Sequence, residues 1–231
     1  MGGGVRIVVS WDGPPEVDLA AEEGALEEAA GGRPVLLLWS WPGPVVVLGH
    51  GQRDDQVDRA LCTREGIPVL RRITGGTGIV HRRDLAVSLA LPAGHPWART
   101  IPAAYDGFVG AVAAALGGLG LEVERPRPVP RRSARERSPV CFETVLSETL
   151  FLGGRKVLGC AQARRRSAVL VHGLLHREPD HALYAAVFGV PPARVRGAVG
   201  GIGPEPGLAG LGDAVTRAFR DALAGTGTAV P

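Results

Sequence analysis

Cys141 and Lys156 carry the scarcest reactive groups in this chain of 231 residues. The chain has 26 lysine and arginine residues, and Lys156 is its only lysine. A lone lysine among arginines indicates a position that needs a compact ammonium rather than a broad guanidinium. A thiolate attacks carbonyl carbons, and a nearby ammonium lowers the pKa of a thiol. The pair therefore indicates nucleophilic acyl chemistry, although a buried structural cysteine and a lysine at a strand end would give the same residues.

The stretch that must position Lys156 is predicted to be a three-stranded antiparallel meander over 149–171. Its strands are separated by Gly153-Gly154, a hairpin signal, and by a polar turn at 164–167. Lys156 would then begin the middle strand just after a tight turn. Cys141 precedes the meander and could fold back over that strand, which would bring the nucleophile within reach of the cation.

A glycine-rich turn from Thr74 to Gly78 lies between two predicted strands. A phosphate-binding loop needs a following helix and a lysine, and this turn has neither. Glycine residues at such a place would let the backbone approach a narrow ligand closely. The alternative is a glycine hairpin that contacts no ligand.

The rest of the chain alternates predicted strands and helices that would support these two turns. Asp54 or Asp55 is predicted to cap a helix, and Cys62 within that helix is expected to pack in the core. The predicted strands are 5–9, 35–41, 45–48, one in the segment that starts at Pro68 and enters the glycine-rich turn, 85–91 and 121–124. The predicted helices are 18–30, 54–65, 100–116, 182–188, 192–199 and 211–224. The last three helices are expected to cap the sheet.

Length and composition bear on the number of domains, the cellular compartment and the possibility of a membrane span. The chain has no linker or internal repeat, so residues 1–231 are expected to form one domain. Three unevenly spaced cysteines and no apolar segment at the start favour a reducing cytoplasm. Prolines interrupt the longest apolar runs, which argues against a membrane span. The net charge is +3.

The basic excess is concentrated in 124–137, which has six arginines and two glutamates. Because no aromatic residues are interleaved with these arginines, nucleic-acid binding is not expected. A solvated loop is the simplest interpretation, and electrostatic steering of an acidic partner toward Cys141 is a second one.

Three segments together resemble the biotin/lipoate protein ligase and octanoyltransferase family. They are RRITGGTGIVH from Arg71, CFE from Cys141, and GGRKVLGCAQAR from Gly153 followed by VHG from Val171. The resemblance extends from about Gly49 to about Val199. It implies an α+β fold, a single domain with a mixed, largely antiparallel sheet flanked by helices. It also implies that an acyl chain lies between the glycine-rich turn and the lysine strand.

The resemblance also implies roles for individual residues. Cys141 would be the nucleophile that forms an acyl thioester, and Lys156 would contact the acyl carbonyl. His172 and Gly173 would form a His-Gly turn beside the ligand, and His81 and His172 are candidate bases. The implied substrate-binding set is Arg71, Arg72, Gly75, Gly76, Thr77, Gly78, His81, Gly159, His172 and Gly173, and no metal ligand is expected.

The implied reaction moves an octanoyl group from octanoyl-acyl carrier protein through Cys141 to a lysine of a lipoyl domain. The glycine cleavage H protein and the acyltransferase subunits of 2-oxoacid dehydrogenases are the implied acceptors. Nucleic acid and membrane are not expected as partners. The chain has no asparagine, whereas the ATP-dependent ligases commonly place an Arg-Asn-Asp segment before the lysine strand. No cofactor is therefore expected, and ATP with Mg²⁺ would be needed only by a ligase.

Several alternatives remain open on the sequence alone. Cys160 lies four residues after Lys156 and could lie on the same strand face. It is the second candidate nucleophile, although packing is its expected role. The acyl donor could be another lipoyl domain, as in an amidotransferase. An ATP-dependent lipoate ligase and a non-catalytic acyl-binding homologue are the other two alternatives.

Overall fold

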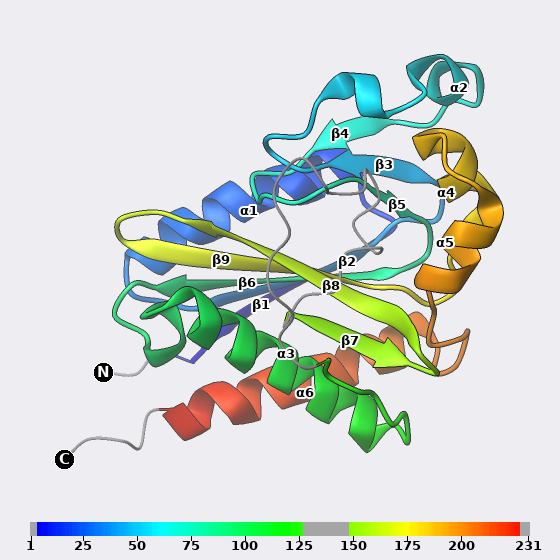
Figure 1. The fold of residues 1–231 in the computed structure, drawn as a ribbon. Helices are drawn as coiled ribbons and strands as arrows, with labels where there is room; N and C mark the ends of the chain where they lie inside the picture. The colour runs from blue at the N-terminus through cyan, green and yellow to red at the C-terminus, as the bar shows by residue number, and fades with distance from the viewer. Residues whose placement is uncertain (1–3, 127–147, 227–231) are drawn as a thin grey trace.

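The computed structural model describes residues 4–126 and 148–226. A six-stranded sheet forms the centre of the described part, with helices on both faces and a smaller three-stranded sheet beside it (Figure 1). The predicted fold class, α+β with a mixed and largely antiparallel sheet flanked by helices, is confirmed. Cys141 and most of the basic segment, from residue 127 onward, lie outside the described residues.

The large sheet has the strand order β1-β2-β6-β9-β8-β7. The pairing of β1 with β2 is parallel, and every other neighbouring pair is antiparallel. The predicted meander is confirmed, because β7, β8 and β9 are consecutive antiparallel strands. The strands are β1 (Arg6–Trp11), β2 (Val35–Ser40), β6 (Leu85–Pro92), β7 (Thr149–Leu152), β8 (Arg155–Arg164) and β9 (Ala168–Leu175).

Local chemistry explains the meander. Gly153 and Gly154 have φ angles of 56° and 74°, as a tight hairpin turn requires. Strands β6 and β9 are buried on both faces and therefore read as continuous apolar runs rather than as strict alternation. Successive side chains in these strands pack on two different cores, one beneath α1 and one beneath α3 and α6.

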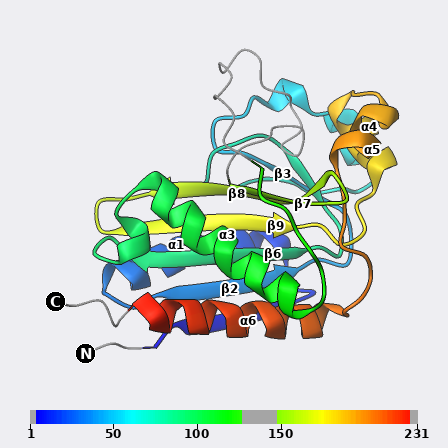
Figure 2. The same cartoon turned by 60° about the horizontal axis from the view of Figure 1, so that its bottom comes forward.

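The two faces of the large sheet carry different helices. Helix α1 (Pro15–Ala30) packs on β2, β6 and β9 from one side. Helices α3 (Ile101–Gly118) and α6 (Leu208–Gly225) pack against each other on the opposite side, as Figure 2 shows. Thr100 caps α3 through a hydrogen bond from the Ala103 amide, as the predicted start at Thr100 requires.

The small sheet has the order β4-β3-β5 and carries the glycine-rich turn. Its strands are β3 (Val45–Leu48), β4 (Val69–Arg71) and β5 (Ile79–His81), with β3 parallel to β4 and antiparallel to β5. Helices α2 (Arg59–Arg64), α4 (His181–Phe188) and α5 (Pro192–Ala198) lie beside this sheet and the start of β8. The strands on either side of the turn therefore flank β3 and do not pair with each other.

Several predicted helix boundaries differ from the observed ones, among them the starts of α1 and α6, which each lie three residues before the predicted positions. Asp54 and Asp55 begin a short 3₁₀ turn, and the α2 helix is instead capped by Asp58, whose carboxylate accepts a hydrogen bond from the Leu61 amide. The helix predicted to end at residue 116 continues to Gly118, and Leu119 is its C-cap. Cys62 is buried and packs in the core, as predicted.

Within the described residues, α3 is the helix whose length and hydropathy alone would suffice to cross a membrane. In this structure Phe108, Val112 and Leu116 on α3 are fully buried against the sheet and α6. A core helix of a globular domain has the same apolar composition, so α3 is accounted for by its packing.

Candidate functional site

Lys156 lies at the start of β8, where the chain leaves the hairpin turn. Only 2% of its surface is exposed, so its ammonium lies inside the protein. Its carbonyl oxygen accepts a hydrogen bond of 2.9 Å from the Gly200 amide, and Lys156 forms a parallel bridge with Val199. A buried ammonium is costly unless charge or hydrogen bonding compensates it, which makes Lys156 a candidate functional group.

A β-bulge separates Lys156 from Cys160. Leu150 pairs with Leu158 and Phe151 pairs with Lys156, so Val157 is an extra residue in β8. Val157 and Leu158 consequently both contribute to the core beneath α3 and α6. The prediction that Lys156 and Cys160 share a strand face assumed a regular strand and was wrong.

Cys160 packs on the α3 side of the sheet. A Cβ atom added to Gly173 would lie 3.2 Å from the Cys160 sulfur and 2.7 Å from the Phe108 ring. Gly173 is therefore required by close packing against α3, and Cys160 fills the same layer. This position supports the packing role that was expected for Cys160.

The glycine-rich turn is held from within by Arg72, which is 2% exposed. Its guanidinium donates to the carbonyl oxygens of Gly75 at 2.8 Å and Thr77 at 3.0 Å. Gly76 has a φ of 95°, and a Cβ atom there would lie 2.8 Å from the same guanidinium. Arg72 and Gly76 thus fix the path of the turn together.

Arg71 braces the neighbouring loop. Its guanidinium donates to the carbonyl oxygens of Gly49 and Gln52, each at 2.7 Å, and pairs with Asp54. The backbone of Gly49 also lies directly against the Gly76 carbonyl, which leaves no space for a Cβ atom. Both arginines of the predicted substrate set therefore shape the protein, and contact of either with a substrate stays a prediction.

The glycines of the turn differ in what surrounds them. A Cβ atom on Gly78 would overlap the Phe188 ring of α4, so Gly78 is required for packing. Gly75 is exposed and has no heavy atom within 4 Å of the position that a Cβ would occupy. Among the turn glycines, Gly75 is thus the one whose surroundings leave room for a ligand.

His81 ends β5 and is buried against Trp41, with 4.9 Å between the ring centroids. Burial holds the pKa of His81 well below its ordinary value, and the nearby His172, His176 and Arg72 lower it further. His81 is therefore neutral at physiological pH. It can accept or donate one hydrogen bond from each ring nitrogen, but it is a weak base.

His172 lies within β9 and not in a turn, so the implied His-Gly turn was wrong. Its Nδ1 atom is 2.7 Å from Glu22 Oε1 and 3.1 Å from the Ser88 hydroxyl, which itself donates to Glu22 at 2.6 Å. All three side chains are buried between α1 and the sheet. Gly159 is in the adjacent strand β8, opposite Leu174 of β9.

Sequence reasoning missed Glu22 and the buried cluster around it. The signal was present, because Glu22 follows Leu19 and precedes Leu26 by helical spacings that place it on the apolar face of α1. The buried polar atoms Glu22 Oε2, His172 Nε2, His81 Nε2 and Trp39 Nε1 have no hydrogen-bond partner within the described residues. A buried polar atom costs free energy until it is paired, so these atoms are available to a bound polar molecule or to water.

A second missed cluster joins the residue after β9 and the residue before β6 to α4. His176 Nδ1 is 2.7 Å from Asp84 Oδ2, and His176 Nε2 is 2.8 Å from the Tyr184 hydroxyl. All three residues are buried. Within the described residues, no group of His, Cys, Asp and Glu has the arrangement of a metal site.

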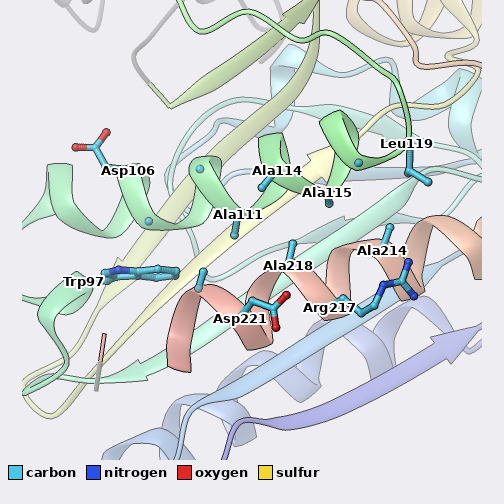
Figure 3. Close-up of a pocket in the computed structure, with 14 residues that line it drawn as sticks. Trp97, Asp106, Ala111, Ala114, Ala115, Leu119, Ala214, Arg217, Ala218 and Asp221 are labelled. Atoms are coloured by element: carbon cyan, nitrogen blue, oxygen red, sulfur yellow. The ribbon is translucent and has the colours of Figure 1, made fainter. Parts of the chain in front are cut away.

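An apolar groove lies on the other side of the molecule, between α3 and α6. Figure 3 shows it lined by Ala111, Ala115 and Ala218, with Arg217 and Asp221 at its rim. The residues that line it include none from the glycine-rich turn and none from β8. The groove is therefore separate from the glycine-rich turn and Lys156.

Sequence comparisons place the site residues of the described part within a known catalytic domain. The model of the lipoyl protein ligase A/B catalytic domain matches residues 14–206. The Octanoyltransferase LipM of Geobacillus kaustophilus is 28% identical over 83% of this chain and 72% of its own length. The Octanoyltransferase LipM of Carboxydothermus hydrogenoformans is 33% identical over 68% of this chain and 59% of its own length.

Solved structures show the same fold. A lipoate-protein ligase A structure bound with ATP superimposes with a TM-score of 0.78 and 24% identity, over 97% of this chain and 86% of the other. A putative lipoate protein ligase from T. acidophilum with bound lipoic acid gives a TM-score of 0.77 and 21% identity, over 97% and 87% of the two chains. The matched segment covers the glycine-rich turn, Lys156 and the buried histidines, and this chain belongs to the lipoyl protein ligase A/B catalytic domain family.

Proposed function

We propose that this protein is an octanoyltransferase of lipoate biosynthesis that transfers octanoyl through a cysteine thioester to a lysine of a lipoyl domain. One observation carries the proposal: the only lysine of the chain is buried at the bulged start of β8, in a protein similar to several octanoyltransferases. A buried, compact ammonium is suited to stabilising the oxyanion that forms during acyl transfer.

The proposed reaction has two steps. The Cys141 thiolate attacks the thioester carbonyl of the octanoyl donor, the carbon–sulfur bond of the donor breaks, and the donor leaves as a thiolate that takes up the proton released when Cys141 ionised. The lysine amine of the acceptor then attacks the octanoyl-Cys141 thioester, an amide forms, and the Cys141 thiolate is released while the amine loses a proton. In both steps the Lys156 ammonium would stabilise the tetrahedral oxyanion.

The partners follow from this chemistry. An acyl donor and a lipoyl-domain acceptor are required by the reaction. We propose octanoyl-acyl carrier protein as the donor, and the glycine cleavage H protein or the acyltransferase subunits of 2-oxoacid dehydrogenases as acceptors. Because one thioester is exchanged for another, the reaction needs no nucleotide, and we propose a cytoplasmic reaction without a cofactor.

The test is intact-protein mass spectrometry after mixing the protein with octanoyl-acyl carrier protein. The expected result is one octanoyl adduct that hydroxylamine removes, followed by loss of that adduct when a lipoyl domain is added. Cys141→Ser should abolish the adduct. Cys160→Ser and Cys62→Ser serve as matched controls that should retain it, because both of these residues pack in the core.

Four outcomes would contradict the proposal. An adduct that persists in Cys141→Ser would place the nucleophile elsewhere. Loading that depends on free octanoate and ATP would identify a ligase, and loading only from another octanoylated lipoyl domain would identify an amidotransferase. A protein that binds the donor and never forms an adduct would be a non-catalytic homologue.

A further inference from the structure

Four hydrogen bonds make His176 the junction of four separate segments next to Lys156. Its amide donates to the Val157 carbonyl at 2.9 Å, and its carbonyl accepts from the Ile202 amide at 3.0 Å. Its side chain is bound at 2.7 Å to Asp84 and at 2.8 Å to Tyr184. His176 is fully buried, so these bonds are shielded from water.

The first of these bonds reaches the bulge that sets the position of Lys156. Val157 is the extra residue of β8 and directly follows Lys156. The bulge interrupts the pairing of β8 with β7, so the position of Lys156 depends on the hydrogen bonds that remain on the other edge of β8. There the His176 amide continues the pairing with β9 at Val157, and the Gly200 amide bonds the carbonyl of Lys156 itself.

A second histidine supports the other side of the lysine. His181, the first residue of α4, is bonded through Nε2 to the Val199 carbonyl at 2.8 Å. Val199 forms the parallel bridge with Lys156. Helix α4 is thus connected to both sides of the lysine, since His181 bonds Val199, and Tyr184 bonds His176, whose amide bonds Val157.

Asp84 anchors this arrangement to the large sheet. Its Oδ2 atom bonds His176, and its Oδ1 atom accepts from the Arg177 amide at 2.9 Å. An Nδ1–H donates to the Asp84 carboxylate, and in that tautomer Nε2 accepts a hydrogen bond from the Tyr184 hydroxyl. In the Asp84–His176–Tyr184 chain, the Asp84 carboxylate therefore orients the His176 ring, and the His176 ring orients the Tyr184 hydroxyl.

We propose that the Asp84–His176–Tyr184 chain, together with His181, is a positioning device that holds the Lys156 ammonium at the acyl-transfer site. His176 and Tyr184 act through the backbone of Val157 and are positioning residues, not catalytic ones. The inference rests on the proposed function for its kinetic consequence. Its structural part, the dependence of Lys156 on α4, stands without that function.

The test uses the fact that the chain has one lysine and two tyrosines. In protein labelled with ¹³C-lysine and carrying no tag lysine, the single side-chain Cε signal reports Lys156. Tyr184→Phe removes one hydroxyl, and Tyr105→Phe is the matched control, because Tyr105 is also buried but lies on α3, on the opposite side of the sheet. The expected result is a shifted or broadened Lys156 signal in Tyr184→Phe and an unchanged signal in Tyr105→Phe.

Kinetics give the second readout. Tyr184→Phe should reduce the single-turnover octanoyl transfer rate at least about tenfold without raising the apparent KM, since a small misplacement of a reacting group costs rate. In a Lys156→Ala background the same substitution should have almost no further effect, because residues that act through one another are not additive. His181→Ala is a second variant that should reproduce both results through Val199.

The outcomes separate this inference from the proposed function. If the wild-type protein transfers no octanoyl group but the lysine signal responds to Tyr184→Phe, the function is wrong and the positioning device remains. If the protein is active while both Tyr184→Phe and His181→Ala leave the lysine signal and the rate unchanged, the inference is overturned. Equal, additive rate losses with and without Lys156 would also overturn it.

Discussion

Arg72 and Lys156 are both 2% exposed, yet the chain uses a different cation at each position. The Arg72 guanidinium reaches the carbonyls of Gly75 and Thr77 at once, a task for which its planar array of donors is suited. Lys156 instead presents one compact ammonium beside a bulge. The solitary lysine is therefore best explained by the geometry of a small charge rather than by charge alone.

Replacing Lys156 by Arg should keep the charge and lose the function. A guanidinium is broader and cannot occupy the position of the ammonium, so the single-turnover transfer rate should fall by about 100-fold to 1000-fold. Because the site is buried, the extra volume should also destabilise the protein by about 1 to 3 kcal/mol. Transfer is measured well below the Tm of both proteins.

The matched control for this substitution is Arg155→Lys. Arg155 is adjacent in β8 but exposed, so exchange of its cation should change stability by less than about 0.5 kcal/mol and leave transfer intact. Near-equal rates for the wild type and Lys156→Arg would remove Lys156 from the mechanism.

Among the elements, the glycine-rich turn tolerates a side chain at Gly75 but not at Gly78. Gly78→Ala would drive a methyl group into the Phe188 ring, and the free energy of unfolding should fall by about 1 to 3 kcal/mol. Gly75→Ala meets no atom and should leave stability within about 0.5 kcal/mol. If an acyl chain lies along the turn, Gly75→Ala should nevertheless raise the apparent KM for the octanoyl donor.

Thermal unfolding and steady-state kinetics check both halves of this prediction. An unchanged KM in Gly75→Ala would mean that the turn serves only the packing of β4, β5 and α4. A stable Gly78→Ala would mean that Phe188 has another position open to it.

The elements that the sequence predicted correctly are those that local chemistry determines. The meander follows from two glycines with positive φ and from strands rich in apolar residues on either side of the turns. Pairings between segments that lie far apart in the sequence could not be predicted. The sequence does not reveal that β3 inserts between β4 and β5, because that pairing depends on where the chain crosses over and not on any local pattern.

In the candidate site, too, some residues could be predicted from the sequence and others could not. Lys156 and the glycine-rich turn were found because their residue types are unusual for this composition. The bulge at Val157 was not, because a continuous apolar run in a buried strand carries no alternation that a bulge could interrupt. Glu22 and the Asp84–His176–Tyr184 chain were missed because their partners lie far away in the sequence.

For the molecule as a whole, the two faces of the large sheet have different chemistry. The face beneath α3 and α6 is an apolar core built from Phe108, Val112 and Phe219 with the facing strand residues. The face beneath α1 also buries Glu22, Ser88 and His172, which are polar groups that an apolar core would exclude. One face therefore supplies stability, and the other combines stability with the polar groups of the candidate site.

The cores also bear on the number of domains. The core beneath α1 is continuous from the large sheet into the small one, since Trp39 and Trp41 belong to the same cluster as the β3 residues and Tyr184 of α4. Sheets that share one core should unfold together, so a single cooperative transition is expected for the full chain.

Differential scanning calorimetry tests this expectation. For 231 residues the unfolding enthalpy should be about 160 kcal/mol at about 60 °C, from about 0.7 kcal/mol per residue, and it should equal the van't Hoff enthalpy. Gly78→Ala should lower the Tm of that one transition without splitting it, because Phe188 belongs to the shared core. Two resolved transitions, with the substitution shifting only one of them, would show instead that the small sheet with α2 and α4 unfolds as a separate unit.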